Sequence, residues 1–415
     1  MNIQSARRRE SVFQLVVIVA ALGYFVDIYD LLLFTVVKQA SMTSLGSTDA
    51  TMLSDSTKVI NWQMIGLLLG GILWGVLGDR RGRLSVLFGS IILYSTANFI
   101  TGFIHTVDQY ALCRFFAGLG LAGELGAGIT LVTELLPKSK RGIGTSLVAG
   151  IGLIGAVVAY LTYYLTDDWR LCYKIGGVLG IALLILRVSV AESGMFLELK
   201  EQSGVKRGNF LMFFTNRDRF RKYIMAILIG LPTWFAIGVL INQSDRFARA
   251  LYGNNAIDSG RSIMFAYIAI SIGDILVGFL CQWLKSRKKG LFIFYVICVL
   301  SGILFFSPFN SNDTRMYAIC AALGFGTGFW AIFVTMGAEQ FGTNLRATAA
   351  TTIPNMVRGS LPLINLLFLD LFQKTWGWPL IRSGITTGIL VMVVTLIAFY
   401  FTDETYHKDL NYVEQ

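Results

Sequence analysis

Twelve long apolar segments dominate this sequence of 415 residues. A helix that crosses a lipid bilayer needs about 20 mostly apolar residues, and only the ninth segment is clearly shorter. The segments lie near residues 12–37, 59–78, 84–103, 109–134, 142–166, 171–190, 223–244, 262–283, 291–307, 315–338, 347–372 and 381–402. Only 14% of all residues are charged, against roughly 25% in soluble domains. The sequence therefore predicts an all-α polytopic membrane protein with twelve transmembrane helices.

Lysine and arginine are concentrated on one side of the predicted membrane. The polar segments before span one and after spans two, four, six and eight carry most of them, whereas the loop 39–57 has neither residue. Basic loops stay in the cytoplasm, although the loop 245–261 is an exception with three arginines. We therefore expect cytoplasmic termini and a location in a bacterial-type inner (plasma) membrane. The net charge of +10 reflects this bias and predicts no binding to nucleic acid.

The longest polar interruption falls near the middle of the chain and separates two halves of similar layout. Glu134 precedes Arg141 by seven residues after span four, and Glu339 precedes Arg346 by seven after span ten. A repeated pair of this kind indicates an internal duplication. The expected domains are a six-helix bundle over 1–190, a cytoplasmic linker over 191–222 and a second six-helix bundle over 223–415.

A charged motif follows span two and reads Gly75-Val-Leu-Gly78-Asp79-Arg80-Arg81-Gly82-Arg83. Its spacing, Gly-x3-Asp-x2-Gly-Arg, resembles the signature of the major facilitator superfamily, and the likeness extends over the full length of the chain. In the second half Gln282 stands where the acid would be. The resemblance implies two six-helix bundles around a cavity that opens alternately to each side. It also implies gating roles, with topogenic charges as the alternative, for Gly75, Asp79, Gly82, Arg83, Glu134, Arg141, Glu339 and Arg346.

Span four contains two charges among many glycines. Arg114 and Glu124 lie inside an apolar stretch, where charged side chains are costly and usually face a partner or a cavity. An arginine followed by small residues and a Gly-Glu pair resembles the metabolite:proton symporter branch of the superfamily, close to sugar porters and aromatic-acid symporters. Glu124 is a candidate for substrate or proton binding, with a structural hydrogen bond to a neighbouring span as the alternative.

Span one carries two carboxylates, Asp27 and Asp30, on one helical face. In a low-dielectric cavity such a pair repels, so one of them is expected to take up a proton near neutral pH. In the symporters that the chain resembles, an acid at this place carries the proton, and its position after Tyr29 favours Asp30. Asp30 and Arg114 have similar expected depth and form the first-choice couple. A fixed structural ion pair between them is the alternative.

Arg358 in span eleven lies near the expected middle of the membrane. An isolated cation there can bind the carboxylate of a solute, or it can neutralise Asp274 or Asp370. Weaker candidates for the cavity wall, each with ordinary packing as the alternative, are Tyr24, Trp234, Asn242, Gln243, Trp330 and Asn355.

Motifs for catalysis and cofactors are missing from the sequence. No Gly-Lys-Ser/Thr phosphate-binding motif occurs, which argues against an ATP-driven pump. The chain has two histidines, and its five cysteines show no paired spacing. We therefore expect no enzyme activity, no cofactor and no metal site.

These features together predict a secondary active transporter. The resemblance implies proton-coupled uptake of a small organic solute, a carboxylate or a zwitterion, by a monomer in the lipid bilayer with the solute and protons as its partners. A proton-coupled exporter and an uncoupled facilitator are the nearer alternatives. A sensor that keeps the fold without transport is the more distant one.

Overall fold

The protein is described here by a computed structural model, which covers residues 15–81, 83–124, 126, 128, 141–191, 210–253, 257–406 and 408. These residues form helices joined by short turns, and no strand occurs among them. The side chains of Asp79, Arg83 and Arg141, and the whole of Gly82 and Glu134, lie outside the described part. The same holds for residues 192–209, so the proposed linker and the exact domain limits stay predictions.

The first half of the chain forms one group of packed helices. These are α2 (Leu15–Ser44), α3 (Met52–Arg81), α4 (Arg83–Thr101), α5 (Val107–Leu121), α7 (Arg141–Leu153), α8 (Gly155–Thr166) and α9 (Trp169–Ala191). Helix α5 packs against α3 and α4, and α2 packs against α7, α8 and α9. Close approach of α3 and α5 depends on glycine, because a Cβ at Gly66 or Gly118 would overlap backbone atoms of the other helix.

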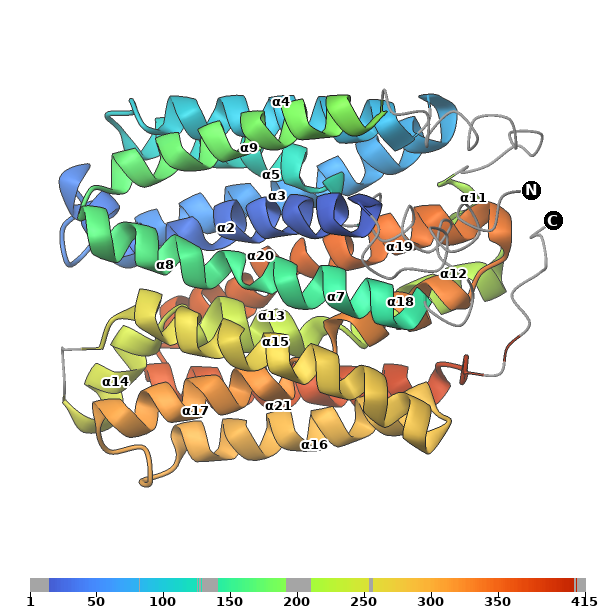
Figure 1. Cartoon of the computed structure of the whole chain (residues 1–415). Helices are drawn as coiled ribbons and strands as arrows, with labels where there is room; N and C mark the ends of the chain where they lie inside the picture. The colour runs from blue at the N-terminus through green and yellow to red at the C-terminus, as the bar shows by residue number, and fades with distance from the viewer. Residues whose placement is uncertain are drawn as a thin grey trace, which may run out of the picture.

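The second half forms a second group that lies beside the first (Figure 1). Its elements are α11 (Met212–Thr215), α12 (Arg217–Leu228), α13 (Leu231–Phe235), η1 (Ala236–Ile241), α14 (Ser244–Tyr252), α15 (Ser259–Leu284), α16 (Arg287–Phe306), α17 (Asp313–Gly326), α18 (Trp330–Glu339), α19 (Thr343–Arg358), α20 (Leu361–Asn365), η2 (Leu366–Thr375) and α21 (Leu380–Phe401). Helix α3 packs along α19, and α15 packs against α7, α8 and α2, so these helices form the interface between the groups.

Three spans of the second half are interrupted near their middle. Pro232 is the second residue of α13, and Pro362 is the second residue of α20. Proline cannot donate a backbone hydrogen bond and so breaks the preceding helix. A glycine-rich turn separates α17 from α18. These breaks place Arg358 at the end of α19 and Trp330 at the start of α18, close to the interface between the groups.

Nine helical segments within the described residues are long and apolar enough to cross a membrane. They correspond to nine of the twelve predicted spans. The fourth span is only partly described, beyond the end of α5, and the eleventh carries charges in α19 and η2. The third corresponds to α4, which has 19 residues. Helices of the described residues thus overlap each of the twelve predicted spans, and nine of them have the length and hydropathy to cross a membrane.

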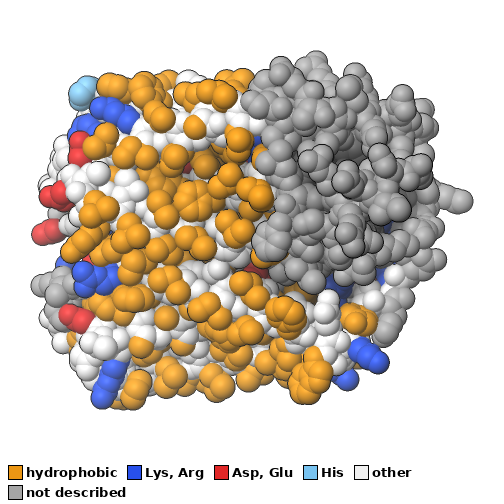
Figure 2. Space-filling model, in the orientation of Figure 1, with side chains coloured by type: hydrophobic (Ala, Val, Ile, Leu, Met, Phe, Trp, Pro, Cys, Tyr) orange, Lys and Arg blue, Asp and Glu red, His pale blue; other side chains and the backbone are white. Residues whose placement is uncertain are grey.

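One face of the molecule has an apolar middle. Apolar side chains cover the middle of the face shown in Figure 2, and charged groups gather towards its left edge. Many large apolar residues are well exposed, including Ile303 at 61% and Tyr400 at 78%. Such a surface is expected where lipid tails replace water. Helix α2 begins and α21 ends at the same end of the molecule (Figure 1), which we call the terminal end; the other is the opposite end.

Candidate functional site

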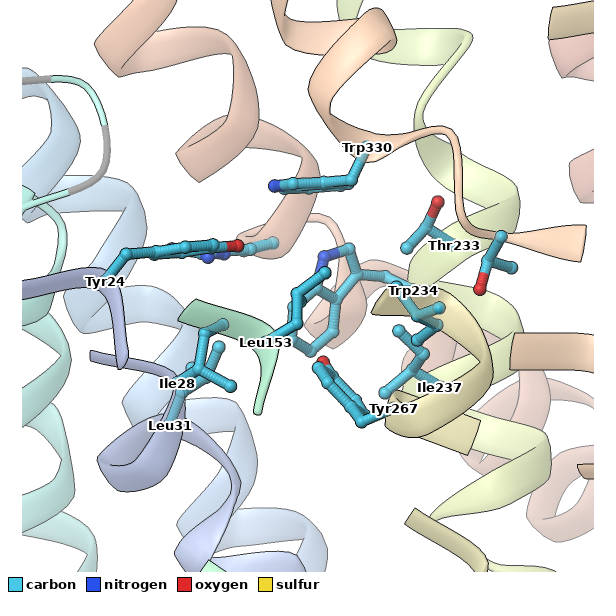
Figure 3. Close-up of a pocket in the computed structure, with 12 residues that line it drawn as sticks. Tyr24, Ile28, Leu31, Leu153, Thr233, Trp234, Ile237, Tyr267 and Trp330 are labelled. Atoms are coloured by element: carbon cyan, nitrogen blue, oxygen red, sulfur yellow. The ribbon is translucent and has the colours of Figure 1, made fainter. Parts of the chain in front are cut away.

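A small cavity lies at the interface between the two helix groups. Its wall includes Tyr24 from α2, Trp234 from α13, Tyr267 from α15, Trp330 from α18 and Arg358 from α19 (Figure 3). Only about 20 Å³ of the cavity is open to the centre of a water molecule. That space suffices for about one water. The structure is therefore a nearly closed state, in which side chains must move to admit a solute.

A charged pair that joins the two halves lies beside this cavity, and only its arginine belongs to the wall. The guanidinium Nη2 of Arg358 lies 3.8 Å from a carboxylate oxygen of Asp27, and both side chains are almost fully buried. Neither carboxylate oxygen of Asp27 has a hydrogen-bond partner among the described residues. Arg358 also lies 5.7 Å from the centre of the Trp330 ring, and its Nη1 donates a long hydrogen bond of 3.5 Å to Asn355. Both charges are thus buried with few compensating bonds, which is costly.

Arg114 and Asp30 come together, although not through their charged groups. Nη2 of Arg114 donates to the backbone carbonyl of Asp30 at 2.6 Å, and Nη1 donates to Asn98 at 2.7 Å. The guanidinium also lies 5.3 Å from the Tyr173 ring centre. The carboxylate of Asp30 is fully buried and has no hydrogen-bond partner within the described residues; its Oδ1 faces Gly176 of α9. The predicted couple is therefore close in space, but the structure contains no direct ion pair between these described side chains.

Glu124 has a strong partner that the sequence did not reveal. Arg187 of α9 donates to its Oε1 at 3.0 Å and lies 2.8 Å from its Oε2. Ser90 of α4 donates to Oε1 at 3.2 Å, and Gly23 of α2 leaves the space that the Arg187 side chain fills. Glu124 and Arg187 are both buried. This arrangement agrees with the structural role that was the alternative for Glu124, because the buried ion pair and the Ser90 bond join α4 and α9 to the segment after α5.

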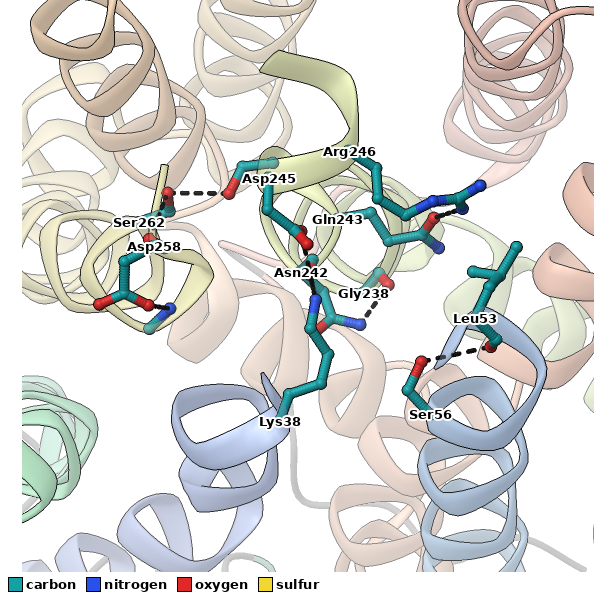
Figure 4. Close-up of polar contacts among 12 residues, drawn as sticks. Lys38, Leu53, Ser56, Gly238, Asn242, Gln243, Asp245, Arg246, Asp258 and Ser262 are labelled. Carbon is teal, nitrogen blue, oxygen red and sulfur yellow. Dashed lines mark hydrogen bonds and ion pairs between the residues drawn. The ribbon is translucent and has the colours of Figure 1, made fainter. Parts of the chain in front are cut away.

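At the opposite end, Lys38 connects the two halves. Its Nζ donates to the backbone carbonyl of Asn242 at 2.7 Å and to the carboxylate of Asp245 at 3.2 Å (Figure 4). Lys38 is only 5% exposed. Gln243 accepts a hydrogen bond from Arg246 at 2.8 Å. Asn242 and Gln243 therefore lie at this contact and outside the cavity wall. At a rise of 1.5 Å per residue, Asn242 is about 12 Å further along the helix axis than Trp234.

Two further contacts reinforce this end. Asn365 donates to Asn61 at 2.8 Å, and Arg261 donates to the hydroxyl of Tyr160 at 3.2 Å. Each of these bonds also joins one half to the other. The opposite end is thus held closed by three separate polar contacts, which we call the opposite-end contacts.

Towards the terminal end, part of the predicted gate can be seen. Gly75 packs on α19, where an added Cβ would lie 3.3 Å from Thr352. Glu339 pairs with Arg287 at 2.7 Å rather than with Arg346, and Nη2 of Arg346 donates to the carbonyl of Phe341 at 3.2 Å. The other predicted gating residues, Asp79, Gly82, Arg83, Glu134 and Arg141, fall wholly or by their side chains outside the described part.

The remaining candidates have other neighbours. Asn355 donates to the carbonyl of Ala122 at 2.8 Å and so bridges the halves instead of lining the cavity. Asp274 accepts from the backbone N–H of Ala331 at 2.9 Å, and Asp370 pairs with Lys374 at 2.6 Å on the surface. Neither acid is the partner of Arg358, which faces Asp27.

Comparison with known proteins decides the family. The sequence model described as the Major Facilitator Superfamily matches residues 20–364. The chain belongs to the major facilitator superfamily. Its proteins are transporters, which agrees with the apolar surface and the cavity between two helix groups, and the fold predicted from the charged motif is confirmed.

Individual relatives are distant but cover most of the chain. The niacin transporter NiaP of Acinetobacter baylyi is 26% identical and matches 80% of this chain and 81% of its own. The cis,cis-muconate transport protein of the same species is 24% identical, and the match covers 84% of this chain and 85% of that protein. The solved structure of the proton:xylose symporter XylE superposes with a TM-score of 0.66 over 95% of this chain and 97% of XylE, at 15% identity. That likeness shows the shared fold.

Proposed function

We propose that this chain is a proton-coupled symporter that imports a small organic anion by alternating access. The proposal rests chiefly on Asp27 and Arg358, which face each other across the two halves at 3.8 Å. A buried guanidinium without a full set of hydrogen bonds can bind the carboxylate of a solute. The same arginine is the only basic side chain of the described part within 4.0 Å of the Asp27 carboxylate.

The coupling follows from competition for Arg358. When a solute carboxylate binds the guanidinium, Asp27 loses its compensating charge and becomes costly to keep ionised in a buried site. Asp27 then takes up a proton, and the loaded cavity carries one solute anion and one proton with no unpaired charge. Asp30 is the second proton candidate, because its carboxylate is buried and Arg114 is occupied by neutral partners. The geometry thus favours Asp27 as the proton carrier, whereas the sequence position after Tyr29 favoured Asp30 for that role.

The opposite-end contacts fit one half of an alternating cycle. Lys38, Asn61 and Arg261 close that end in this state, and their separation would open the cavity there. The predicted terminal-end charges would close the other end in turn. We further propose that the terminal end faces the cytoplasm of a bacterial-type inner membrane, and that a monomer carries out the cycle.

Uptake into proteoliposomes tests this function. The full chain is reconstituted and given an inside-alkaline pH gradient with labelled carboxylates, amino acids, betaines and sugars. We expect accumulation of a carboxylate above the outside concentration, and its loss when a protonophore is added. Equilibration that ignores the gradient would make the chain a facilitator, and accumulation only under the reversed gradient would make it an exporter.

A further inference from the structure

Asp274 of α15 is a buried acid that the proposed cycle does not use. Its side chain is almost fully buried, and its Oδ1 accepts a hydrogen bond from the backbone N–H of Ala331 at 2.9 Å. Its Oδ2 has no hydrogen-bond partner in the described part of the chain, and no basic side chain of that part forms an ion pair with it. A buried carboxylate is costly unless another group compensates it. The first turn of α18 is the group that faces this one.

Helix α18 has no cap of its own. The N–H groups in the first turn of a helix lack partners inside that helix, and a polar residue just before the helix commonly accepts from one of them. Three neighbouring helices, α15, α16 and α17, are capped in this way by Asp258, Ser286 and Asn312. The residue before α18 is Phe329, which makes no such bond. Asp274 supplies it from α15 instead, because Ala331 is the second residue of α18, a position whose N–H a cap normally binds.

Close backbone contact sets the distance between Asp274 and α18. The turn before α18 contains Gly328, where an added Cβ would lie 2.8 Å from the Cα of Gly273 and 3.0 Å from the backbone nitrogen of Asp274. Small residues allow two helix backbones to approach each other in this way. The turn therefore lies against α15 at the residue whose carboxylate reaches the first turn of α18.

Helix α18 links the cavity to the terminal end. Its first residue, Trp330, projects into the cavity (Figure 3), and the centre of its ring lies 5.7 Å from the guanidinium carbon of Arg358. Its last residue, Glu339, forms the ion pair with Arg287. The ten residues of the helix span about 15 Å at 1.5 Å per residue. The position of the first turn therefore decides where an indole ring lies against the arginine that faces Asp27.

We propose that Asp274 is a positioning residue of the transport site, because its carboxylate caps α18 and so holds Trp330 beside Arg358. The indole N–H of Trp330 has no hydrogen-bond partner among the described residues, so the ring depends on its helix for its position. Asp274 is not among the residues that line the cavity, and it acts through α18. This inference rests on the role proposed above for Arg358 in solute binding, but the cap itself can be tested without transport.

Fluorine NMR of the full chain in lipid nanodiscs tests the cap. The tryptophans carry a fluorinated indole, and the signal of Trp330 is identified by its loss in Trp330→Phe. Asp274→Leu keeps a side chain of similar size and removes the acceptor, so we expect the Trp330 signal to move by more than its linewidth. The signal of Trp283, which is 80% exposed and is identified in the same way, should stay in place.

The conservative variant separates positioning from stability. Asp274→Asn keeps an oxygen that can accept the same N–H, and asparagine and aspartate cap helices about equally well. We therefore expect the Trp330 signal of Asp274→Asn at its original position. A residue that only stabilises the fold would leave the Trp330 signal of the folded protein unmoved in both variants, and that result would overturn the proposal.

Two further variants complete the test. Should Asp274→Leu fail to fold, Asp274→Thr takes its place, because its hydroxyl is too short to reach α18 and can donate to the carbonyl four residues back, as Thr335 and Thr352 do. Asn312→Ala is the matched control, since it removes the cap of α17, the helix directly before α18, and should leave the Trp330 signal in place. An equal shift in this control or in Asp274→Asn would overturn the proposal. If Trp330 responds as expected but the chain accumulates no solute of the uptake panel, the cap would stand and the symport proposal would fall.

Discussion

Asp27 of α2 and Arg358 of α19 face each other at 3.8 Å across the interface between the two halves. The distance is too long for a hydrogen bond, and neither oxygen of Asp27 has another partner among the described residues. A structural ion pair of this burial normally has short, multiple hydrogen bonds, because these offset the cost of removing the charges from water. The loose geometry instead suits a pair that separates and re-forms during a cycle.

Replacing Asp27 should uncouple transport from protons. In Asp27→Asn the residue can no longer bind and release a proton, so we expect accumulation to fall to equal concentrations inside and outside. Exchange of labelled for unlabelled solute should persist, since Arg358 is retained. Loss of the competing carboxylate should also raise the affinity for a solute anion, by about tenfold (~1.4 kcal/mol). Gradient-driven uptake and counterflow in proteoliposomes measure the two effects separately.

The control for this substitution is Asp370→Asn. Asp370 carries the same charge but pairs with Lys374 on the surface, where its side chain is 56% exposed. We expect unchanged uptake and counterflow in this variant. If Asp27→Asn still accumulated the solute to the level of the unmodified chain and Asp30→Asn did not, Asp30 would be the proton carrier.

Removal of Lys38 should loosen the opposite end. Lys38→Met keeps the length of the side chain and removes its bonds to Asn242 and Asp245. Because these bonds join the halves, we expect faster hydrogen–deuterium exchange of backbone amides in α14 and at the end of α2, by about tenfold or ~1.4 kcal/mol. The matched control is Lys58→Met, since Lys58 is exposed and its partner, Asp108, belongs to the same half. Equal exchange in both variants would show that Lys38 does not hold this end closed.

Breaking the pair of Glu124 and Arg187 should mainly reduce stability. Arg187→Met leaves the Glu124 carboxylate buried without its cation, which costs about 3–5 kcal/mol. The double variant Glu124→Gln/Arg187→Met removes both charges and should recover most of the loss in thermal unfolding of the purified protein. Proton-driven uptake should survive in that double variant. A stable double variant that has lost coupling would instead give Glu124 a role in proton transfer.

Sequence reasoning found the charges of the site but not their partners. Asp27 and Arg358 stand out because charges inside apolar spans are rare and costly. Their pairing depends on how the two halves meet, which no local pattern records. Lys38 was missed because it follows directly after the apolar run of span one. A basic residue at that position is also expected simply as the polar end of a membrane span. Arg187 lies three residues before the end of predicted span six and was missed there, although a charge inside a span is costly.

The fold was more predictable than the cavity wall. Span lengths and the motif that begins at Gly75 depend on local sequence, and the family comparison confirms what they imply. Asn242 and Asn355 were chosen for the wall because they are polar, but each bonds across to other backbone or side-chain groups away from the cavity. Thr233 and Tyr267 line the cavity and are ordinary residues in their spans. Only the rotation of each helix, fixed by packing, decides which of them faces inward.

Contact between α3 and α5 should be sensitive to a single methyl group. A Cβ at Gly66 would overlap the backbone carbonyl of Phe115, which cannot move unless the helices separate. We expect Gly66→Ala to destabilise the protein by about 1–3 kcal/mol, although alanine alone favours a helix. Gly302→Ala in α16 is the control, because nothing lies within 4 Å of its added Cβ, and it should be neutral or slightly stabilising. Equal thermal stability of the two variants would mean that α3 and α5 are less closely packed than this structure shows.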